Sequence, residues 1–315
     1  FMSFSIIVPV YDCPKQTEKL LSSLVINLKH CGHYTEVIII DDGSVILSKD
    51  VCEEYKQDLL IKYYKIPHSG PGAARNFGVK QSVGEYLIFL DSDVTLPPGY
   101  LQAVLQELYY NAPDAFGGPE KYDSSFSILQ RAYCCTCSST SASSLLYGSD
   151  IGNSVYYPRT YNMGIRRDAF DSLGGFSNIS HGEDIALSFR IIGEKKSCRQ
   201  FLNAWVFHKR QESLCTFAKK SYKLGEVRAI LSEFNPKSSK RIMMFALLAN
   251  PLILVLFVLS FVKPIVSLPL IVFVLSIIIK TIIRERNFLL GIVSAITTII
   301  YVFFFGFGYV LRKIK

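Results

Sequence analysis

Two aspartates separated by one serine, Asp91 and Asp93, directly follow the apolar run Tyr86 to Leu90. That run is rich in strand-forming residues, so it predicts a buried strand that ends in a tight acidic turn. Carboxylate oxygens in such a turn suit Mg²⁺ or Mn²⁺, and a diphosphate can fill the remaining coordination positions. Alone this pattern is weak evidence, because solvated loops often contain an Asp-x-Asp. It gains weight from similar turns earlier in the chain.

A second acidic turn, Asp41-Asp42-Gly43-Ser44, ends the aliphatic run Val37 to Ile40. Its oxygens could accept hydrogen bonds from ribose hydroxyls or from the imino group of a base. The turn could equally join a strand to a helix, with Asp42 or Ser44 capping that helix. The two roles are compatible, so both stay open.

A third turn, Gly70 to Asn76, has Pro71 where a first helical residue is expected, and Arg75 lies one turn further on. A helix N-terminus and a guanidinium together favour the binding of a diphosphate. The segment is not a Walker A loop, because it lacks Gly-Lys-Ser/Thr. It also differs from a dinucleotide fingerprint, because it follows the third strand-like run and not the first.

A regular alternation over the first 110 residues positions these turns. Strand-like runs separated by helix-length segments predict an α/β fold with a mostly parallel sheet covered on both faces. The four runs are Ser5 to Val10, Glu36 to Ile40, Leu59 to Tyr64 and Tyr86 to Leu90. Ligands of such a sheet bind beyond the carboxyl ends of the strands, so we expect the turns to converge on one crevice.

Apolar residues dominate the C-terminal part of the chain in three runs, Ile242 to Val262, Ile265 to Ile283 and Phe288 to Leu311. Each is long enough to cross a bilayer, which takes roughly 20 residues of helix. We expect an α-helical membrane domain over residues 242–315 with two or three spans. Three crossings would place the basic tail outside, against the positive-inside bias, whereas two would leave one run re-entrant or interfacial.

The net charge of +8 is concentrated in the same half of the chain. Residues 1–208 carry 18 basic and 22 acidic side chains, and residues 209–315 carry 16 and 4. Basic residues ahead of the first apolar run are expected on the cytoplasmic side, against anionic headgroups. Nucleic-acid binding would also explain the charge, but no recognition motif accompanies it, so we expect no nucleic-acid partner.

Residues 213–241 form a basic amphipathic segment between the two halves. From Ser213 to Phe234 the apolar positions recur at spacings near 3.5, with lysines between them, which predicts a helix. The pattern is consistent with a helix in the membrane interface. It is equally consistent with a helix packed on the core of the domain.

The eight cysteines bear on the compartment. The chain shows no signal-peptide pattern at its start, so we expect the N-terminal domain in the cytoplasm and the thiols reduced. Cys134, Cys135 and Cys137 form the one cluster, but the paired spacing and fourth ligand of a zinc site are lacking. We interpret them as thiols buried in a helix. The expected location of the protein is the cell membrane, crossed several times.

Together these segments resemble family 2 glycosyltransferases of the GT-A fold. The resemblance rests on the order and spacing of Ser5 to Tyr11, Ile40 to Ser44, Gly70 to Asn76 and Leu90 to Asp93. It continues through Asn162 to Arg167, Gly174 to Phe176, His181 to Arg190 and Val206 to His208, and so covers about residues 3–230. It implies a Rossmann-like GT-A catalytic domain over residues 1–212, ahead of the amphipathic and membrane segments.

The resemblance implies an inverting transfer, in which an acceptor hydroxyl attacks the anomeric carbon opposite the departing nucleoside diphosphate. Asp184 matches the family's general base, although the same Gly-Glu-Asp sequence can also cap a helix. Acceptor contacts are implied at Glu183, Arg190 and Asn162. Donor contacts are implied at Pro9, Tyr11, Asp12, Asp41, Asp42, Gly72, Arg75, Asp91 and Ser92.

The cofactor implied by the resemblance is Mn²⁺ or Mg²⁺, and the donor is a nucleotide sugar, most commonly a UDP-sugar. Asp91 and Asp93 would bind the metal, with His208 as a further ligand. A lone histidine is more often a packed core residue, so the role of His208 stays open. Neither the sugar nor the oligomeric state is encoded in these motifs.

One departure from the family's processive members narrows the expected activity. Those members carry a Gln-x-x-Arg-Trp motif near the membrane, whereas the only tryptophan here, Trp205, lies outside any such motif. We therefore expect a hexosyltransferase that adds one sugar to a membrane-associated acceptor, such as a polyprenyl-linked saccharide or a glycolipid.

Two alternatives stay open. A nucleotidyltransferase would need a glycine-rich basic loop after the first strand, which Val10 to Pro14 does not provide. The chain could also be a catalytically inactive, membrane-anchored scaffold that binds sugar, and the presence of Asp91, Asp93 and Asp184 argues against this.

Overall fold

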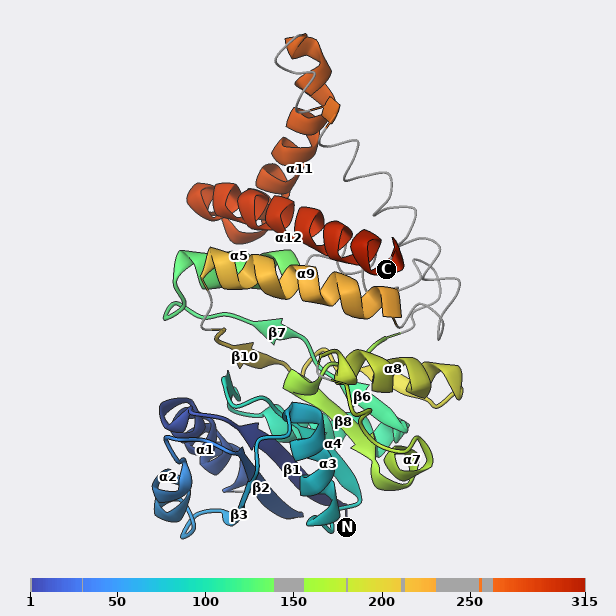
Figure 1. Ribbon diagram of the computed structural model, residues 1–315. Helices are drawn as coiled ribbons and strands as arrows, with labels where there is room; N and C mark the ends of the chain where they lie inside the picture. The colour runs from blue at the N-terminus through green and yellow to red at the C-terminus, as the bar shows by residue number, and fades with distance from the viewer. Residues whose placement is uncertain are drawn as a thin grey trace. The chain divides into compact units, whose positions relative to one another are not determined.

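Figure 1 shows the computed structural model, which describes residues 2–29, 31–138, 156–179, 181–210, 213–230, 255–256 and 263–314. Its contacts divide the chain into two compact units. We name them the sheet unit, Phe1–Lys121 with Gly152–Lys209, and the helical unit, Tyr122–Ile151 with Arg210–Lys315. We expected residues 1–212 to form one continuous domain. The contacts instead group Tyr122–Ile151 with the C-terminal helices.

A seven-stranded sheet with the order β3-β2-β1-β4-β8-β6-β9 forms the centre of the sheet unit. Its strands are β1 (Ser3–Val10), β2 (Tyr34–Asp42), β3 (Leu60–Ile66), β4 (Tyr86–Phe89), β6 (Ala115–Gly117), β8 (Met163–Arg166) and β9 (Cys198–Gln200). The first four strands are parallel, and β8 is antiparallel to both of its neighbours. The prediction of a mostly parallel α/β sheet is confirmed.

Helices pack on both faces of this sheet, as the aliphatic strands require. They are α1 (Pro14–Leu28), α2 (Lys49–Glu54), α3 (Pro71–Lys80), α4 (Tyr100–Asn111), α7 (Arg167–Ser172) and α8 (Glu183–Gly193). Along β2 the side chains alternate between two cores. Val37 and Ile39 pack with α1 and α4, whereas Ile38 and Ile40 pack with α3, α7 and α8. The middle of the strand is therefore apolar on both faces, and two aspartates, Asp41 and Asp42, lie at its carboxyl end.

A second, three-stranded sheet lies at the end of β4. It has the order β5-β10-β7, formed by β5 (Val94–Thr95), β10 (Val206–His208) and β7 (Glu120–Lys121). β10 pairs antiparallel with β5, which sets His208 opposite Val94, and it pairs parallel with β7. Two distant parts of the sequence, β7 and β10, are thereby brought to the turn that holds Asp91 and Asp93.

The helical unit contains α5 (Ile128–Ser138), α9 (Leu214–Ile230), the short 3-10 helix η3 (Pro264–Ser267), α11 (Leu268–Glu285) and α12 (Phe288–Ile314). The helix predicted from Ser213 onward is confirmed as α9 over the residues that the structure describes. Cys134, Cys135 and Cys137 lie in α5, and the first two are buried.

Of the helices that the structure describes, α12 is the one that is long and apolar enough to cross a membrane. The run predicted at 265–283 corresponds to η3 and α11, and the last turns of α11 contain Lys280, Arg284 and Glu285. The run predicted at 242–262 lies outside the described residues, apart from 255–256. A membrane domain with several spans therefore stays a prediction.

Candidate active site

The loops after β1 and β2 are joined by hydrogen bonds at the carboxyl edge of the sheet. Asp12 has a left-handed backbone (φ 49°), and its Oδ1 accepts hydrogen bonds from the backbone N–H groups of Val45 and Ile46, each at 2.8 Å. In return, Ser44 Oγ accepts a hydrogen bond from the N–H of Asp12 at 2.9 Å. The side chain of Asp12 thus fixes the loop that follows β2.

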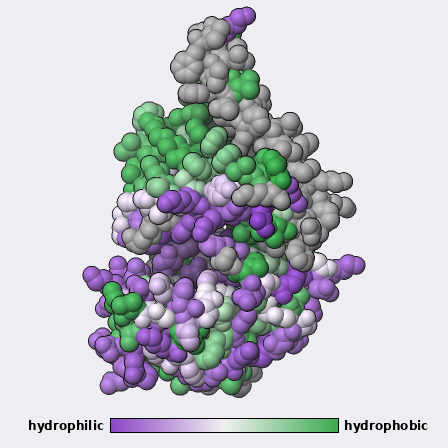
Figure 2. All heavy atoms as spheres, viewed as in Figure 1, coloured by the Kyte–Doolittle hydropathy of each residue, from purple (hydrophilic) through white to green (hydrophobic). Residues whose placement is uncertain are grey.

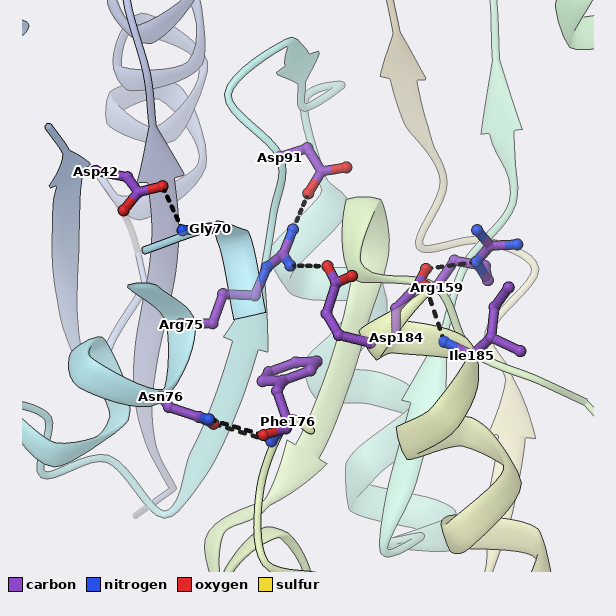
Figure 3. A network of polar contacts seen from close by, with 10 residues as sticks. Asp42, Gly70, Arg75, Asn76, Asp91, Arg159, Phe176, Asp184 and Ile185 are labelled. Atoms are coloured by element: carbon purple, nitrogen blue, oxygen red, sulfur yellow. Dashed lines mark hydrogen bonds and ion pairs between the residues drawn. The ribbon is translucent and has the colours of Figure 1, made fainter. Parts of the chain in front are cut away.

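Asp41 and Asp42, at the end of β2, have different partners. Asp41 is buried and accepts hydrogen bonds from the N–H of Ser44 at 2.8 Å and from Tyr63 Oη at 2.6 Å. Asp42 accepts from the N–H groups of Ser69 at 2.7 Å and Gly70 at 3.0 Å, and Figure 3 shows the contact with Gly70. The carboxylate of Asp42 therefore holds the loop in front of α3.

An aromatic pair lies beside these carboxylates. Tyr11, at the end of β1, is 51% exposed, and its ring centroid lies 4.8 Å from that of His68. His68 Nδ1 lies 2.9 Å from the carbonyl oxygen of Asp42. The pair gives the end of β1 an exposed π surface on which a nucleobase could stack, close to the acidic groups predicted to bind the donor.

Arg75 connects two loops of the site (Figure 3). It is 3% exposed and donates from Nη2 to Asp91 Oδ1 at 2.7 Å and from Nη1 to Glu183 Oε1 at 2.8 Å. Its guanidinium lies over the ring of Phe176, 5.6 Å from the centroid. A buried guanidinium needs partners of opposite charge, and the two carboxylates supply them. Arg75 therefore ties the acidic turn after β4 to the start of α8.

Gly72 permits this approach. A Cβ atom at Gly72 would lie 3.0 Å from Glu183 Cγ, which is tighter than ordinary van der Waals contact. The first turn of α3 can therefore approach the first turn of α8 because position 72 has no side chain. This is a structural reason for the glycine that is compatible with its predicted place in the donor site.

Glu183 and Asp184 begin α8, and their environments differ. Burial and the neighbouring charge of Asp184 raise the pKa of Glu183. Burial also acts to raise the pKa of Asp184, but the charge of Arg159 and its hydrogen bond outweigh this effect and hold that pKa below its usual range. Arg159 Nε donates to Asp184 Oδ2 at 2.6 Å, and the N–H of Ile185 donates to Oδ1 at 2.8 Å (Figure 3). Asp184 is therefore ionised and firmly oriented.

The side chains of Asp91, Asp93 and His208 form a possible metal site. One ligand atom from each lies within 4.8 Å of the others, and His208 Nε2 is 3.1 Å from Asp93 Oδ1. Two carboxylates and one imidazole are a donor set that suits Mn²⁺ and is compatible with Mg²⁺. The three residues predicted as metal ligands are thus brought together by the pairing of β10 with β5.

Two residues that the sequence did not single out complete these groups. Glu120 in β7 is buried, and its Oε2 lies 2.9 Å from His208 Nδ1. A carboxylate that accepts the Nδ1–H proton favours the tautomer whose Nε2 carries the lone pair that can bind a metal, an arrangement common around metal-binding histidines. Arg159, just ahead of the 3-10 helix η1 (Thr160–Asn162), is the second. No local pattern marks either residue, because long-range pairing places them.

Asn162 and Arg190, predicted to bind the acceptor, make internal hydrogen bonds. Asn162 is buried, accepts from Tyr100 Oη at 2.7 Å and donates to the carbonyl of Ala204 at 2.7 Å. Arg190 donates to the carbonyl oxygens of Leu173 and Gly175. These bonds hold neighbouring loops in place. Acceptor binding by either residue stays a prediction.

Ser92, between the two aspartates, accepts a hydrogen bond at Oγ from Cys13 Sγ at 3.2 Å. This bond links the acidic turn to the start of α1. Pro9 lies next to Ile40 in the register of β1 and β2. All residues predicted to bind the donor therefore lie at or next to the carboxyl ends of β1, β2 and β4, or in the first two turns of α3.

Comparison with known proteins gives one family match. The model of the family described as "Glycosyl transferase family 2" matches residues 5–174, more than half of the 315-residue chain. A poly(ribitol-phosphate) beta-N-acetylglucosaminyltransferase, TarS of Staphylococcus aureus, is 38% identical over 96 residues, which are 29% of this chain and 16% of TarS. The minor teichoic acid biosynthesis protein GgaA of Bacillus subtilis is 37% identical over 105 residues, which are 32% of this chain and 24% of GgaA.

The chain thus spans less than a quarter of the length of these two relatives. Among solved structures, a mannosyltransferase from Pyrobaculum calidifontis in complex with GDP-Man and Mn²⁺ has a TM-score of 0.64 at 14% identity, over 95% of this chain and 87% of that one. Residues 1–349 of S. aureus TarS with UDP-GlcNAc have a TM-score of 0.55 at 18% identity, over 79% of this chain and 72% of that one. At these identities the likeness shows a common fold.

Proposed function

The chain belongs to glycosyl transferase family 2, and from that premise we propose that it is an inverting, metal-dependent enzyme that adds a single sugar to a membrane-associated acceptor. The donor is a nucleotide sugar, and we propose a UDP-sugar. The acceptor group is a hydroxyl or a phosphate on a polyprenyl-linked saccharide or a glycolipid.

One observation carries this proposal, namely the bridge that Arg75 makes between Asp91 and Glu183. An inverting transfer needs a base on one side of the anomeric carbon and a stabilised leaving group on the other. Asp91 belongs to the proposed diphosphate and metal site, and Glu183 is next to the proposed base, Asp184. A single buried side chain therefore sets the distance between the two halves of the reaction, which favours an active enzyme over an inactive scaffold.

In the proposed reaction the acceptor O–H proton moves to Asp184 as the acceptor oxygen forms its bond to the anomeric carbon. The bond from that carbon to the phosphate oxygen breaks, and its electron pair leaves with the nucleoside diphosphate. Because Arg159 keeps the pKa of Asp184 low, the base is ionised before substrate binds. Glu183, whose pKa is raised, can orient an acceptor hydroxyl beside it.

Asp91, Asp93 and His208 would hold the divalent metal. When bound, a divalent cation neutralises the charge on the departing diphosphate. Asp93→Asn should then abolish metal-dependent donor binding, measured as the affinity for UDP-sugar with Mn²⁺ and with a chelator. Donor binding and turnover equal to those of the parent would show that Asp93 has no such role.

A uridine donor is supported by the relative with the greater local similarity. TarS, whose structure was solved with UDP-GlcNAc, is 38% identical over 96 residues. The mannosyltransferase solved with GDP-Man has only 14% identity. The stacked pair of Tyr11 and His68 accepts any base by its face, so it does not itself select uridine.

A membrane-associated acceptor is supported by the order of features along the chain. Asp184 is followed by His208, then by the basic helix α9, and then by the apolar helices α11 and α12. Confining enzyme and acceptor to one surface removes much of the cost of bringing them together. Basic residues such as Lys219, Lys220 and Lys223 suit an acceptor that carries phosphate.

The donor test is a screen for nucleotide release by the full chain in detergent, with UDP-GlcNAc, UDP-glucose and GDP-mannose as donors. We expect release from a UDP-sugar, loss of release with a chelator and recovery with Mn²⁺. The matched control is Asp184→Asn, which should bind the donor but transfer sugar more slowly by roughly two to four orders of magnitude. Donor binding without turnover by the parent enzyme, for every donor and acceptor, would favour the scaffold.

The acceptor test compares a polyprenyl-phosphate-linked saccharide with a water-soluble glycoside of the same terminal sugar. The full chain in lipid vesicles should transfer to the lipid-linked acceptor at least about tenfold faster, since effective concentration on a shared surface is high. Equal rates, or transfer to the soluble glycoside only, would contradict a membrane acceptor.

A further inference from the structure

Helix α12 has two different faces along its whole length. The buried face carries Leu290, Ser294, Thr297, Tyr301, Phe305 and Tyr309. The opposite face is exposed and apolar from end to end, and its most exposed members are Phe288, Leu289, Ile296, Phe303, Phe307 and Ile314. We name these six residues the apolar stripe. A helix of 27 residues is about 40 Å long, so the stripe is as long as a bilayer is thick.

Two other helices cover the buried face. α5 packs on the first half, where Thr136 Oγ1 lies 2.7 Å from Thr297 Oγ1 and Cys135 packs in one cluster with Leu290. α9 packs on the second half and runs in the same direction as α12. Phe217 contacts Tyr301, and two turns further on Gly225 meets Phe305 and Tyr309.

The contact of α9 with α12 is close. A Cβ atom at Gly225 would lie 2.0 Å from the carbonyl oxygen of Phe305, and one at Gly308 would lie 2.1 Å from that of Tyr222. Only glycine allows the two backbones to approach so closely. The helices are therefore a packed pair, and whatever surrounds α12 must also surround α9.

The outer face of α9 is basic. Lys219, Lys220 and Lys223 are exposed, within two turns of Phe217, which packs against Tyr301 at the midpoint of α12. If α12 crossed a bilayer, these three lysines would lie near its centre. There each lysine lowers the probability of insertion by roughly two orders of magnitude on the biological scale. Three such side chains make a crossing by the α9–α12 pair very unfavourable.

We propose that α12 lies in the plane of the membrane interface, with its apolar stripe against lipid acyl chains and the lysines of α9 facing headgroups and water. Figure 2 shows hydrophobic side chains over α12 bordered by hydrophilic ones over α9. The inference rests on the membrane attachment in the proposed function and specifies its geometry. The partner surface is a lipid bilayer because the stripe carries no charge while the opposite face of the helix pair is cationic.

The residues between α11 and α12 also suit a position in the membrane interface. α11 ends at Arg284-Glu285, and Arg286 adopts a left-handed backbone (φ 51°) that stops the helix. Asn287 Oδ1 then accepts a hydrogen bond from the N–H of Leu290 at 2.8 Å and starts α12. Three charged residues at this break suit the headgroup region. α11, whose one buried residue is Thr281, can enter the bilayer from there.

The in-plane geometry also agrees with the positions of the basic residues at the end of α12. Arg312 and Lys313, in the last turn of α12, then remain on the same side as the lysines of α9. This agrees with the positive-inside bias.

The test is depth-dependent quenching of tryptophan fluorescence by brominated lipids. The full chain carries Trp205→Phe, which removes its only tryptophan, and single tryptophans replace Leu289, Ile296, Phe303 or Ile314. Vesicles of phosphatidylcholine and phosphatidylglycerol contain lipids brominated at shallow or deep acyl positions. A tryptophan in place of Tyr109, which is 80% exposed on α4 of the sheet unit, is the aqueous control, and nucleotide release confirms that each variant is folded.

We expect all four positions of the stripe to be quenched at one shallow depth. A crossing helix would instead place Phe303 about 21 Å deeper than Leu289 along the helix axis, with a deep maximum at the centre and shallow ends, and this result would overturn the inference. Stripe tryptophans with no quenching, in a protein that is still incorporated into vesicles, would also overturn it and favour a contact with a second copy. Failure of the parent protein to associate with vesicles would instead refute the membrane attachment itself.

Discussion

The sheet unit and the helical unit obtain their functional surfaces in different ways. In the sheet unit, the polar residues with proposed chemical roles lie where β1, β2 and β4 end, and parallel pairing brings these ends to one edge. In the helical unit the surface is a continuous apolar face on α12, created because α5 and α9 cover the other side.

The difference teaches that sequence patterns carry unequal information in the two units. In a parallel sheet, an acidic turn that follows a strand can be placed from the sequence, because the carboxyl ends of the strands share one edge. An amphipathic pattern predicts which face of a helix is apolar, but it does not show what covers that face. We therefore expect substitutions in the sheet unit to change catalysis without changing membrane association, and substitutions between α9 and α12 to do the reverse.

The largest expected effect in the sheet unit is that of Asp184→Asn. Removal of a positioned base lowers the rate of transfer by roughly two to four orders of magnitude. Donor affinity and vesicle association should be unchanged, because the amide keeps the size of the side chain. The matched control, Asp171→Asn, alters an exposed carboxylate on α7 and should leave kcat unchanged. A kcat for Asp184→Asn near that of the parent would assign the base to another group, with Glu183 as the neighbour to examine.

The sequence predicted where these residues lie, because they are local to strand ends, and their roles in binding and catalysis stay predictions. The four strands, the acidic turn at Asp91 and Asp93 and the loop before α3 all lie where the alternation placed them. The fold class followed from the same alternation. The sequence did not predict that Arg75 forms ion pairs with Asp91 and Glu183, because these partners are 16 and 108 residues away in the chain.

Other features lay beyond any local pattern. Glu120 approaches His208 only because β7 pairs with β10, and Arg159 approaches Asp184 only through the tertiary fold. The sequence predicted a helix around Cys134, Cys135 and Cys137, but not its extent, Ile128–Ser138. Its position beside α12 depends on contacts such as that of Thr136 with Thr297. Apolar length predicted that residues 288–311 would form a helix. It could not show that two other helices would cover one side of that helix.

The second largest effect is expected for Glu120→Gln. The neutral amide can still accept the Nδ1–H of His208 but loses the negative charge that strengthens the imidazole as a ligand. Changes to such a supporting carboxylate typically lower metal affinity by about 10–100-fold. Mn²⁺ titration of nucleotide release should show a higher Mn²⁺ requirement with nearly normal kcat at saturation.

Glu107→Gln, at a partly exposed position of α4, is the matched control and should not alter the Mn²⁺ requirement. If Glu120→Gln behaves like this control, His208 is a packed core residue and the metal site consists of the aspartates. That result would remove the second sheet from the site and weaken the contrast between the two units.

In the helical unit, Gly308→Ala tests the close contact of α12 with α9. The added Cβ would meet the carbonyl of Tyr222 at 2.1 Å, and overpacking of this kind typically costs about 1–3 kcal/mol. We expect a lower midpoint of thermal unfolding for the helical unit, measured by limited proteolysis at increasing temperature. Nucleotide release at low temperature should be unchanged. Gly193→Ala, where a Cβ would meet nothing within 4 Å, is the control and should not lower it. Equal midpoints for the two variants would show that α9 does not constrain α12.

The smallest expected effect is a shift in the pH profile caused by Arg159→Gln. Arg159 lowers the pKa of Asp184, so the parent base stays ionised at pH values where a free carboxyl would begin to take up a proton. Glutamine keeps a hydrogen-bond donor but removes the charge, and the pKa of Asp184 should rise. Activity should then fall off at a higher pH on the acidic side, while the rate on the alkaline plateau stays close to that of the parent.

The pH dependence of kcat/KM measures the shift, and Arg166→Gln, whose arginine pairs with Asp114 and Asp168, should leave the acidic limb in place. An unchanged acidic limb in Arg159→Gln would mean that the ionisation of Asp184 does not govern transfer. The role of base would then belong to another carboxylate of the sheet unit.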